Sequence, residues 1–312
     1  MKLLPAIFTV AAISAVPVSA TKVILDNDWS TAGFIPYLLA LNAGWDVLGL
    51  VGDTSNSWAL QTSLHALATL EAGNLSSCIP VYKGSDYPLL NTPELFRAWE
   101  EIHGVLPWEG VFAAQNVTAE KEAVILRLEV PTEFASLAKG LVIMGGYIDV
   151  NLFEVTGSVT QADINSDINL MIDPEASKIA LTANFPNITI VGNCANQVYP
   201  TEAYWKEVYT IQNPYTTLAY KFFGTSFPYW DETAIFAVLD PANVLNSTSF
   251  YLDVDTAWSS PSYGNIHAYQ EALMPKRQVL QRVNYVLEVD SLKLKSEIKH
   301  ALQNPKTCAD IS

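Results

Sequence analysis

The sequence predicts an α/β protein with a mostly parallel open sheet and helices on both of its faces. Two observations carry this prediction. Short apolar, β-branched segments alternate with longer helical segments, and the connections between them are short. This alternation is typical of strands that return through helices to the same edge of a sheet. In addition, acidic residues follow directly after expected strands, where open α/β sheets bind their ligands.

The first part of the chain is expected to contain three strands and two helices. Strands are predicted over 22–27, 46–52 and 79–82, and helices near 32–43 and 57–72. The segment 32–43 is apolar on most sides, which is typical of a helix buried between a sheet and another layer.

The second part continues the alternation. A strand is expected over 141–145, followed by a helix that opens at Asp173-Pro174-Glu175, a strand over 188–191 and a helix that starts at Asp231. Proline at the first helical position and acids in the first turn are helix start signals.

Residues 1–20 have the pattern of a secretory signal peptide. Lys2 precedes an apolar stretch from Leu3 to Val16, and small residues end the segment at Ala20. A buried first strand is the alternative, but the chain from Thr21 onward already supplies one. No later run reaches the roughly 18 apolar residues of a membrane span. We therefore expect a secreted, extracellular, soluble protein with no membrane partner.

The composition limits the partners of the chain. Lys and Arg number 17 against 32 Asp and Glu, for a net charge of −15. This balance argues against a nucleic-acid surface, which needs a basic patch, and against attraction to anionic lipid. No linker or repeat divides residues 21–312, so we expect one domain. Whether it forms a homo-oligomer stays open.

Glycosylation sequons and cysteines bear on the expected export. The sequons start at Asn74, Asn116, Asn187 and Asn246. Behind a signal peptide, we expect glycans on some of them. The cysteines are Cys78, Cys194 and Cys308, too few for a disulfide framework or a zinc site. At most one pair can form a disulfide, and the sequence leaves the pairing open.

Two carboxylates end the first expected strand. Asp26 and Asp28 are two residues apart, so on an extended chain both side chains can point to the same side. In an open α/β sheet, this edge is where ligands bind. A helix cap is the alternative role for Asp28. A cap explains one carboxylate but not two.

Further motifs follow this corner in order along the chain. They are Val51-Gly52-Asp53, Lys83-Gly84-Ser85-Asp86-Tyr87-Pro88-Leu89, His103-Gly104, Val142-Ile143-Met144-Gly145-Gly146, the segment 167–176, and Trp230-Asp231-Glu232. Together with Asp26 and Asp28, they resemble the motifs of the inosine-uridine preferring nucleoside hydrolase family. The resemblance covers nearly all of residues 21–312 and implies a Rossmann-type sheet.

The chain departs from the family pattern in two places. The family opens with Asp-x-Asp-Pro-Gly-x-Asp-Asp, whereas Trp29-Ser30 replaces Pro-Gly here and Ala32-Gly33 replaces the last two acids. A Leu-Thr-Asn element, in which the family has a calcium-ligating carbonyl, is also absent. We therefore expect an apparent deletion near 115–135. A shortened paralogue and a sequence that lacks an exon-sized piece both explain it.

The resemblance implies a role for each of several residues. Cleavage of an N-glycosidic bond passes through a sugar cation and needs an activated water, acceptors for the sugar hydroxyls and help for the departing base. Asp28 would be the general base and a calcium ligand, and Asp231 would complete the metal site. Asp167 and Asn169 would hold sugar hydroxyls.

The remaining candidates would act around these residues. Asp26 would accept hydrogen bonds behind the substrate, with Asp53 beside it. His103 would protonate the leaving base or simply face water. Trp230 would stack on a nucleobase or pack in the core.

Calcium is the cofactor that the resemblance implies. It takes six to eight oxygen ligands. Asp28 and Asp231 alone leave most of these positions to water and substrate, so we expect a weak or absent site.

Two of these residues have alternative structural roles. Asp231 could instead cap a helix, and Asn169 could close a turn.

The sequence therefore predicts a secreted hydrolase of N-glycosidic bonds in ribonucleosides or related small glycosides. The replacement of two acids by Ala32 and Gly33 favours an alternative, a catalytically inactive nucleoside- or sugar-binding protein of the same fold. A third alternative is a defective product of a shortened transcript, which would be insoluble.

Overall fold

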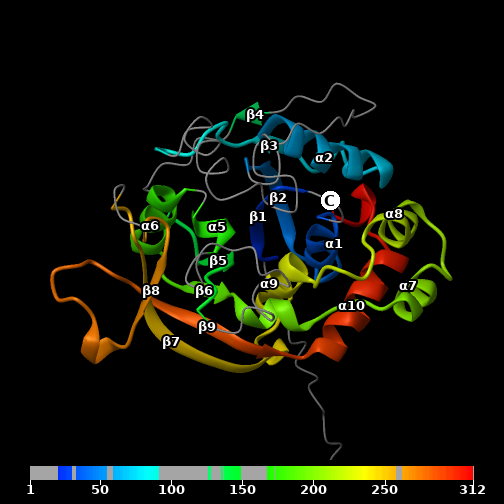
Figure 1. Cartoon of the computed structure of the whole chain (residues 1–312). Coiled ribbons are helices and arrows are strands. Elements are labelled where there is room, and N and C mark those ends of the chain that lie inside the picture. Colours follow the sequence, from blue (N-terminus) through cyan, green and yellow to red (C-terminus); the bar gives the residue numbers. More distant parts are fainter. Residues whose placement is uncertain are drawn as a thin grey trace, which may run out of the picture.

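The computed structural model describes residues 20–29, 33–54, 59–90, 126–127, 135, 137–148, 167–171, 173–257 and 262–311. Their strands form two hydrogen-bonded sheets (Figure 1). One has four strands in the order β1-β2-β3-β4, and the other has five in the order β5-β6-β9-β7-β8. The expected signal segment and most of the segment 115–135 lie outside these residues, so both expectations stay predictions.

The four-stranded sheet is parallel throughout, as the alternating pattern predicts. Its strands are β1 (Lys22–Asn27), β2 (Asp46–Gly52), β3 (Val81–Lys83) and β4 (Leu126–Arg127). Asn27 pairs with Gly52, and Gly52 pairs with Lys83. The carboxyl ends of the first three strands therefore lie side by side at one edge.

Two helices connect the first three strands. They are α1 (Ile35–Asn42) and α2 (Ala59–Ala72). Every residue of α1 from Ile35 to Leu41 is buried, which confirms the expectation for this apolar segment. The helix packs on β2 and also on α9 (Trp230–Leu239) and α10 (Ser291–Gln303). A helix that is apolar all round is stable only when covered on most sides.

The five-stranded sheet is mixed. Its strands are β5 (Leu141–Met144), β6 (Ile188–Val191), β7 (Val244–Val254), β8 (Ile266–Tyr269) and β9 (Arg282–Val289). The first two strands and β9 run parallel, whereas β7 is antiparallel to both β8 and β9. The alternating strand and helix pattern predicts the parallel part. The antiparallel strands near the end of the chain are additional to it.

The later helices surround the sheets (Figure 1). They are α5 (Ile168–Met171), α6 (Pro174–Thr182), α7 (Glu202–Val208), α8 (Pro214–Phe222), α9 (Trp230–Leu239) and α10 (Ser291–Gln303). Helix α6 starts as expected, because the Asp173 carboxylate accepts a hydrogen bond of 3.0 Å from the Ala176 amide. Within the described residues, no helix combines the length and the apolar character required to cross a membrane.

Helix α9 joins the two sheets. It packs against α1 on one side and against β5, β6 and β9 on the other. Its residues from Glu232 to Ala237 are buried. The N-terminal turn of α9 therefore meets the carboxyl ends of strands, where the candidate site residues gather.

One disulfide closes the chain. Cys78, which follows α2, is bonded to Cys308 in the short 3-10 helix Cys308–Asp310, with 5.8 Å between the Cα atoms. Cys194 is buried and has a free thiol. The structure thus settles the pairing that the sequence leaves open.

Candidate active site

The ends of β1 and β2 bring three candidate acids together. Asp26 lies in β1 and is exposed, Asp28 follows β1 and is half-buried, and Asp53 follows β2 directly. The Asp53 amide donates a hydrogen bond of 3.4 Å to the Asn27 carbonyl, which continues the pairing of the two strands. Asp28 does not cap α1, because that helix begins at Ile35 with Phe34 in the cap position.

Trp29 fixes the course of the chain after β1. Its backbone has a φ of 52°, which is rare for a bulky residue. The indole Nε1 donates a hydrogen bond of 2.6 Å to the Val51 carbonyl, and the side chain is 3% exposed. Such backbone strain persists only where the surroundings hold it. Trp29, in place of the family's proline, anchors the turn that carries Asp28.

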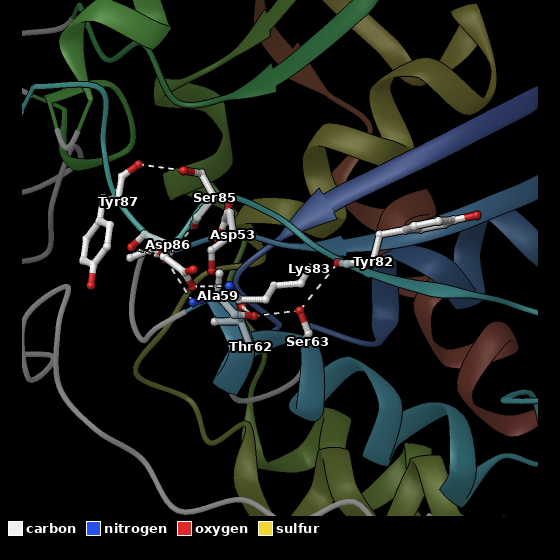
Figure 2. A network of polar contacts seen from close by, with 10 residues as sticks. Asp53, Ala59, Thr62, Ser63, Tyr82, Lys83, Ser85, Asp86 and Tyr87 are labelled. Atoms are coloured by element: carbon white, nitrogen blue, oxygen red, sulfur yellow. Dashed lines mark hydrogen bonds and ion pairs between the residues drawn. The ribbon is translucent and has the colours of Figure 1, made fainter. Parts of the chain in front are cut away.

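A network of polar contacts fixes the backbone beside Asp53 (Figure 2). The Thr62 hydroxyl donates to the Asp53 carbonyl over 2.7 Å, and the Ala59 amide donates to the Thr54 hydroxyl over 2.9 Å. The Thr54 hydroxyl in turn donates to the Ser85 carbonyl, 3.0 Å away. The end of β2, the start of α2 and the loop after β3 are therefore tied together.

Asp231 approaches this edge from α9. Its Oδ2 accepts a hydrogen bond of 3.1 Å from Nδ2 of Asn27, which is 204 residues away in the sequence. Tyr229 is the cap residue of α9 and makes no capping hydrogen bond with its side chain. Asp231 lies inside the first turn, so it is not a helix cap. Sequence reasoning missed Asn27, whose only signal is its place between Asp26 and Asp28.

The acids of this edge act on one another. We call Asp26, Asp28, Asp53 and Asp231 the four-acid cluster. Burial raises the pKa of Asp231 to about 7, with a further contribution from Asp28, whereas the bond from Asn27 opposes the rise. Burial also raises the pKa of Asp53 well above its usual value, assisted by the other three acids.

Asp26 is a milder case within the cluster. Desolvation by the surrounding protein raises its pKa to about 6. The Asp26 side chain is nevertheless exposed to solvent. Water screens its charge, so the raised pKa corresponds to only a small change in the free energy of folding. Asp53 and Asp231 are more buried, so the repulsion among the acids is less screened at these two carboxylates.

A second group forms at the end of β5. The amide of Gly146 donates to Oδ2 of Asp167, and the amide of Asn169 donates to Oδ1 of Asp167 over 3.0 Å. Gly145 and Gly146 both have positive φ, of 133° and 75°. The Gly-Gly turn therefore wraps closely around the Asp167 carboxylate.

Asp167 and Asn169 differ in their access to solvent. Asp167 is fully buried, and this burial raises its pKa to about 6 although three backbone amides oppose the rise. Asn169 is exposed, and its Nδ2 donates to the Met144 carbonyl over 3.2 Å. Of the two, Asn169 presents its amide toward the surface, whereas Asp167 holds the turn.

Tyr147 connects the two groups. It is 4% exposed, and its pKa is raised first by burial and then by the charges of Asp167 and Asp231. Its ring thus lies within electrostatic reach of an acid from each group. Sequence reasoning missed Tyr147, although it follows Met144-Gly145-Gly146 directly.

Trp230 lies next to Asp231 in the first turn of α9. Its Nε1 donates a hydrogen bond of 2.6 Å to Oδ1 of the buried Asn196. Phe227 meets the Trp230 ring edge to face, with 5.7 Å between the centroids, and is 46% exposed. Trp230 is half-buried and packs against the hydrophobic core, so its ring is held from several sides. His103 lies outside the described residues.

The side chains near the four-acid cluster do not form a ready calcium site. Among the residues that the structure describes, no group of three or more His, Cys, Asp or Glu side chains is placed to hold a metal ion. Gly33 stands where the family has an acid, and Oδ2 of Asp231 is engaged by Asn27. Oδ1 of Asp53 is buried without a hydrogen-bond partner. The negative charge of the four-acid cluster would attract a cation, but the side chains are not arranged to coordinate one.

Comparison with known proteins gives consistent matches. The sequence matches the inosine-uridine preferring nucleoside hydrolase family over residues 23–128 and 123–296. An uncharacterized protein of Schizosaccharomyces pombe, C800.11, is 32% identical in an alignment that covers 84% of this chain and 79% of that protein. A second uncharacterized protein of that yeast, C1683.06c, is 24% identical over 57% of this chain and 63% of its own length.

Solved structures share the fold. A plant nucleoside hydrolase, the PpNRh1 enzyme, superposes with a TM-score of 0.67 at 19% identity, over 91% of this chain and 99% of its own. An inosine-guanosine nucleoside hydrolase gives 0.69 at 16% identity with the same coverage. A purine-preferring ribonucleoside hydrolase from Gardnerella vaginalis gives 0.67 at 17% identity, over 94% of this chain and all of its own.

Proposed function

This chain belongs to the inosine-uridine preferring nucleoside hydrolase family, and on that premise we propose that it hydrolyses the N-glycosidic bond of ribonucleosides or related small glycosides. One observation supports the proposal above the others. Asp26, Asp28 and Asp53 lie at the carboxyl ends of β1 and β2, and a hydrogen bond from Asn27 brings Asp231 of α9 to the same edge. Carboxylates at this edge are placed for ligand chemistry.

Asp28 is the proposed general base. It takes a proton from a water molecule, whose oxygen forms a bond with the anomeric carbon as the bond to the base nitrogen breaks. The departing base leaves with the bonding electrons and takes up a proton. We assign that proton to His103 as the proposed acid. Asp28 is half-buried beside the anchored Trp29, so its carboxylate is held at the strand end while still reachable by water.

Asn169 is the better candidate for direct contact with sugar hydroxyls. It is exposed and fixed through its bond to the Met144 carbonyl. Asp167 is fully buried, and we give it the part of positioning the turn that carries Asn169. Asp26 and Asp53 accept hydrogen bonds from substrate or from ordered water within the four-acid cluster.

Trp230 provides the proposed surface for the base. Its indole is fixed by the bond to Asn196, so the ring plane is set before a ligand arrives. Stacking of a base on an aromatic side chain contributes about 1–3 kcal/mol. A fixed ring loses little conformational entropy on binding.

Calcium is proposed to bind weakly at most, at Asp28 and Asp231. A calcium ion needs six to eight oxygens. Among the described residues, no group of three or more His, Cys, Asp or Glu side chains is placed to hold such an ion. No step of the proposed reaction therefore passes through the ion.

A binding protein without hydrolytic activity is the second candidate. Gly33 at the place of a family acid favours it, because this residue has no side chain to hold a ligand. The Trp230 ring and the Asp167 turn would serve binding equally well. Only the fate of the glycosidic bond separates the two candidates.

A panel of purine and pyrimidine ribonucleosides tests the proposal. Release of free base is followed by chromatography, and binding of the same nucleosides is measured by calorimetry. Release above the spontaneous rate supports the hydrolase. Binding without release favours the second candidate, and soluble, folded protein with neither binding nor release contradicts both.

Secretion is part of the proposal. We infer that the mature chain begins at Thr21 and carries glycans. Asn74, Asn187 and Asn246 are all exposed, and the Asn187 amide also donates to the Lys139 carbonyl over 3.3 Å. N-terminal sequencing and glycan mapping of material from the medium test both points. An intact Met1 on secreted protein would contradict the first.

A further inference from the structure

The contact between Asn27 and Asp231 ties the end of β1 to the first turn of α9. Nδ2 of Asn27 donates to Oδ2 of Asp231 over 3.1 Å, and the pair is half-buried. Asn27 stands between Asp26 and Asp28 in the sequence. Its neutral amide meets a carboxylate from a distant part of the chain.

The orientation of the amide is fixed from the other side. Oδ1 of Asn27 accepts a hydrogen bond from the Trp29 amide over 3.4 Å, which leaves Nδ2 to face Asp231. The Asn27 carbonyl also accepts the Asp53 amide over 3.4 Å. Because Trp29 is itself held by Val51, the donor is in place before any ligand binds.

Asp231 needs such a partner. Its side chain is part-buried at the strand ends that are followed by Asp28 and Asp53. Lys83, near the strand ends, forms its ion pair with Asp86. A carboxylate in this setting is held in place by a cation or by hydrogen-bond donors.

We infer that the Asn27 amide takes the place of a bridging cation at Asp231, and holds this carboxylate opposite Asp28 by a direct hydrogen bond. Asn27 is thus a positioning residue, which acts through Asp231. The inference rests on the geometry of this pair and stands whether or not the chain hydrolyses nucleosides.

An exchange of the two partners tests the inference. Four proteins are compared: the natural protein, Asn27→Asp, Asp231→Asn, and the double variant that carries both changes. Each is melted with calcium and with chelator, and calcium is titrated by calorimetry. The double variant keeps an amide and a carboxylate facing each other with the roles exchanged.

The expected results separate the amide from a cation. Asn27→Asp puts two carboxylates face to face, so its melting temperature in chelator should fall. Calcium should restore it, with an affinity about tenfold or more above that of the natural protein, since affinity follows ligand charge. The double variant should regain much of the lost melting temperature in chelator and show no such calcium response.

Two outcomes would overturn the inference. Strictly additive losses in the double variant would mean that the pair is not coupled. An equal calcium response in the natural protein and in Asn27→Asp would mean that the amide does not take a cation's place. The test is independent of turnover, so a failed nucleoside assay leaves it unchanged.

Matched variants guard against general effects. Asn304→Asp makes the same chemical change at an exposed amide that bonds the His300 carbonyl over 3.1 Å, and it should give no calcium response. Asn27→Leu removes the hydrogen-bond donor without adding charge. This variant replaces Asn27→Asp in the comparison if Asn27→Asp does not fold. It should lower the melting temperature and stay insensitive to calcium. A melting temperature equal to that of the natural protein would contradict the inference.

Discussion

A Cβ atom on Gly145 would lie 2.7 Å from Oδ2 of Asp167, closer than real Cβ contacts allow. The same residue has a φ of 133°, which side chains rarely adopt. Only glycine therefore lets the chain after β5 close around the buried carboxylate.

Gly145→Ala should lower the free energy of unfolding by about 2–4 kcal/mol, through combined strain and displacement of Asp167. Gly44→Ala is the matched control, because Gly44 also has positive φ but has nothing within 4 Å of its Cβ position. The control should lose only about 1 kcal/mol. Urea unfolding measures the free energy of unfolding of both variants. Equal losses of this free energy in Gly145→Ala and Gly44→Ala would show that the contact with Asp167 is unimportant.

The buried Asp167 should make stability depend on pH. Its pKa is raised from 3.8 to about 6, so between these values the folded protein holds a proton that the unfolded chain releases. Its contribution to stability is therefore fully present below about pH 4 and is lost as pH rises through 6. Asp167→Asn should flatten the fall in unfolding free energy from pH 4 to 7 by on the order of 1–3 kcal/mol.

Urea unfolding at several pH values measures this slope. An asparagine also changes the hydrogen bonds to Gly146 and Asn169, but that change is the same at every pH. An unchanged slope in Asp167→Asn would therefore show that Asp167 is ionised in the folded protein across the whole range.

The disulfide should contribute substantially to stability. Cys78 and Cys308 are separated by 230 residues, and bonds that close long loops restrict the unfolded chain most. Cys308→Ser should lower the free energy of unfolding by about 2–5 kcal/mol and make it insensitive to reductant. Cys194→Ala, at a free buried thiol, should keep the sensitivity to reductant. A Cys308→Ser protein still destabilised by reductant would point to another disulfide.

Trp230 should matter for binding. Trp230→Ala removes the ring next to Asp231 in the sequence and should weaken nucleoside binding by roughly 1–3 kcal/mol, which is roughly 5- to 150-fold in Kd. Phe222→Ala is a suitable control, since Phe222 is a 63% exposed aromatic at the end of α8. Calorimetry with a ribonucleoside compares them. Equal affinities for both variants would remove Trp230 from the site.

Local signals in the sequence predict the parallel framework well. β1, β2 and β6 have the expected bounds, and α6 begins with the expected Asp173 cap. These elements depend on short-range rules such as β-branched runs and proline at a helix start. The antiparallel strand β7 is set by pairing with β8 and β9, which local sequence does not encode.

The candidate site likewise has features that the sequence predicts and features that depend on the folded chain. The family resemblance implies that Asp26, Asp28, Asp53 and Asp231 share one edge, and the hydrogen bond from Asn27 brings Asp231 to the end of β1. The Asn27 contact spans 204 residues, so it could not be read from spacing. The burial of Asp167 likewise depends on how the Gly145-Gly146 turn closes, which only the folded chain specifies.

The rate of base release by Asp28→Asn tests the central claim most directly. The variant should fold and bind a ribonucleoside like the natural protein, yet release base about 10² to 10⁴ times more slowly, because it lacks the general base. Asp46→Asn, at an exposed acid that starts β2, should keep the natural rate. Release by Asp28→Asn at the rate of the natural protein would contradict the account and place the chemistry elsewhere.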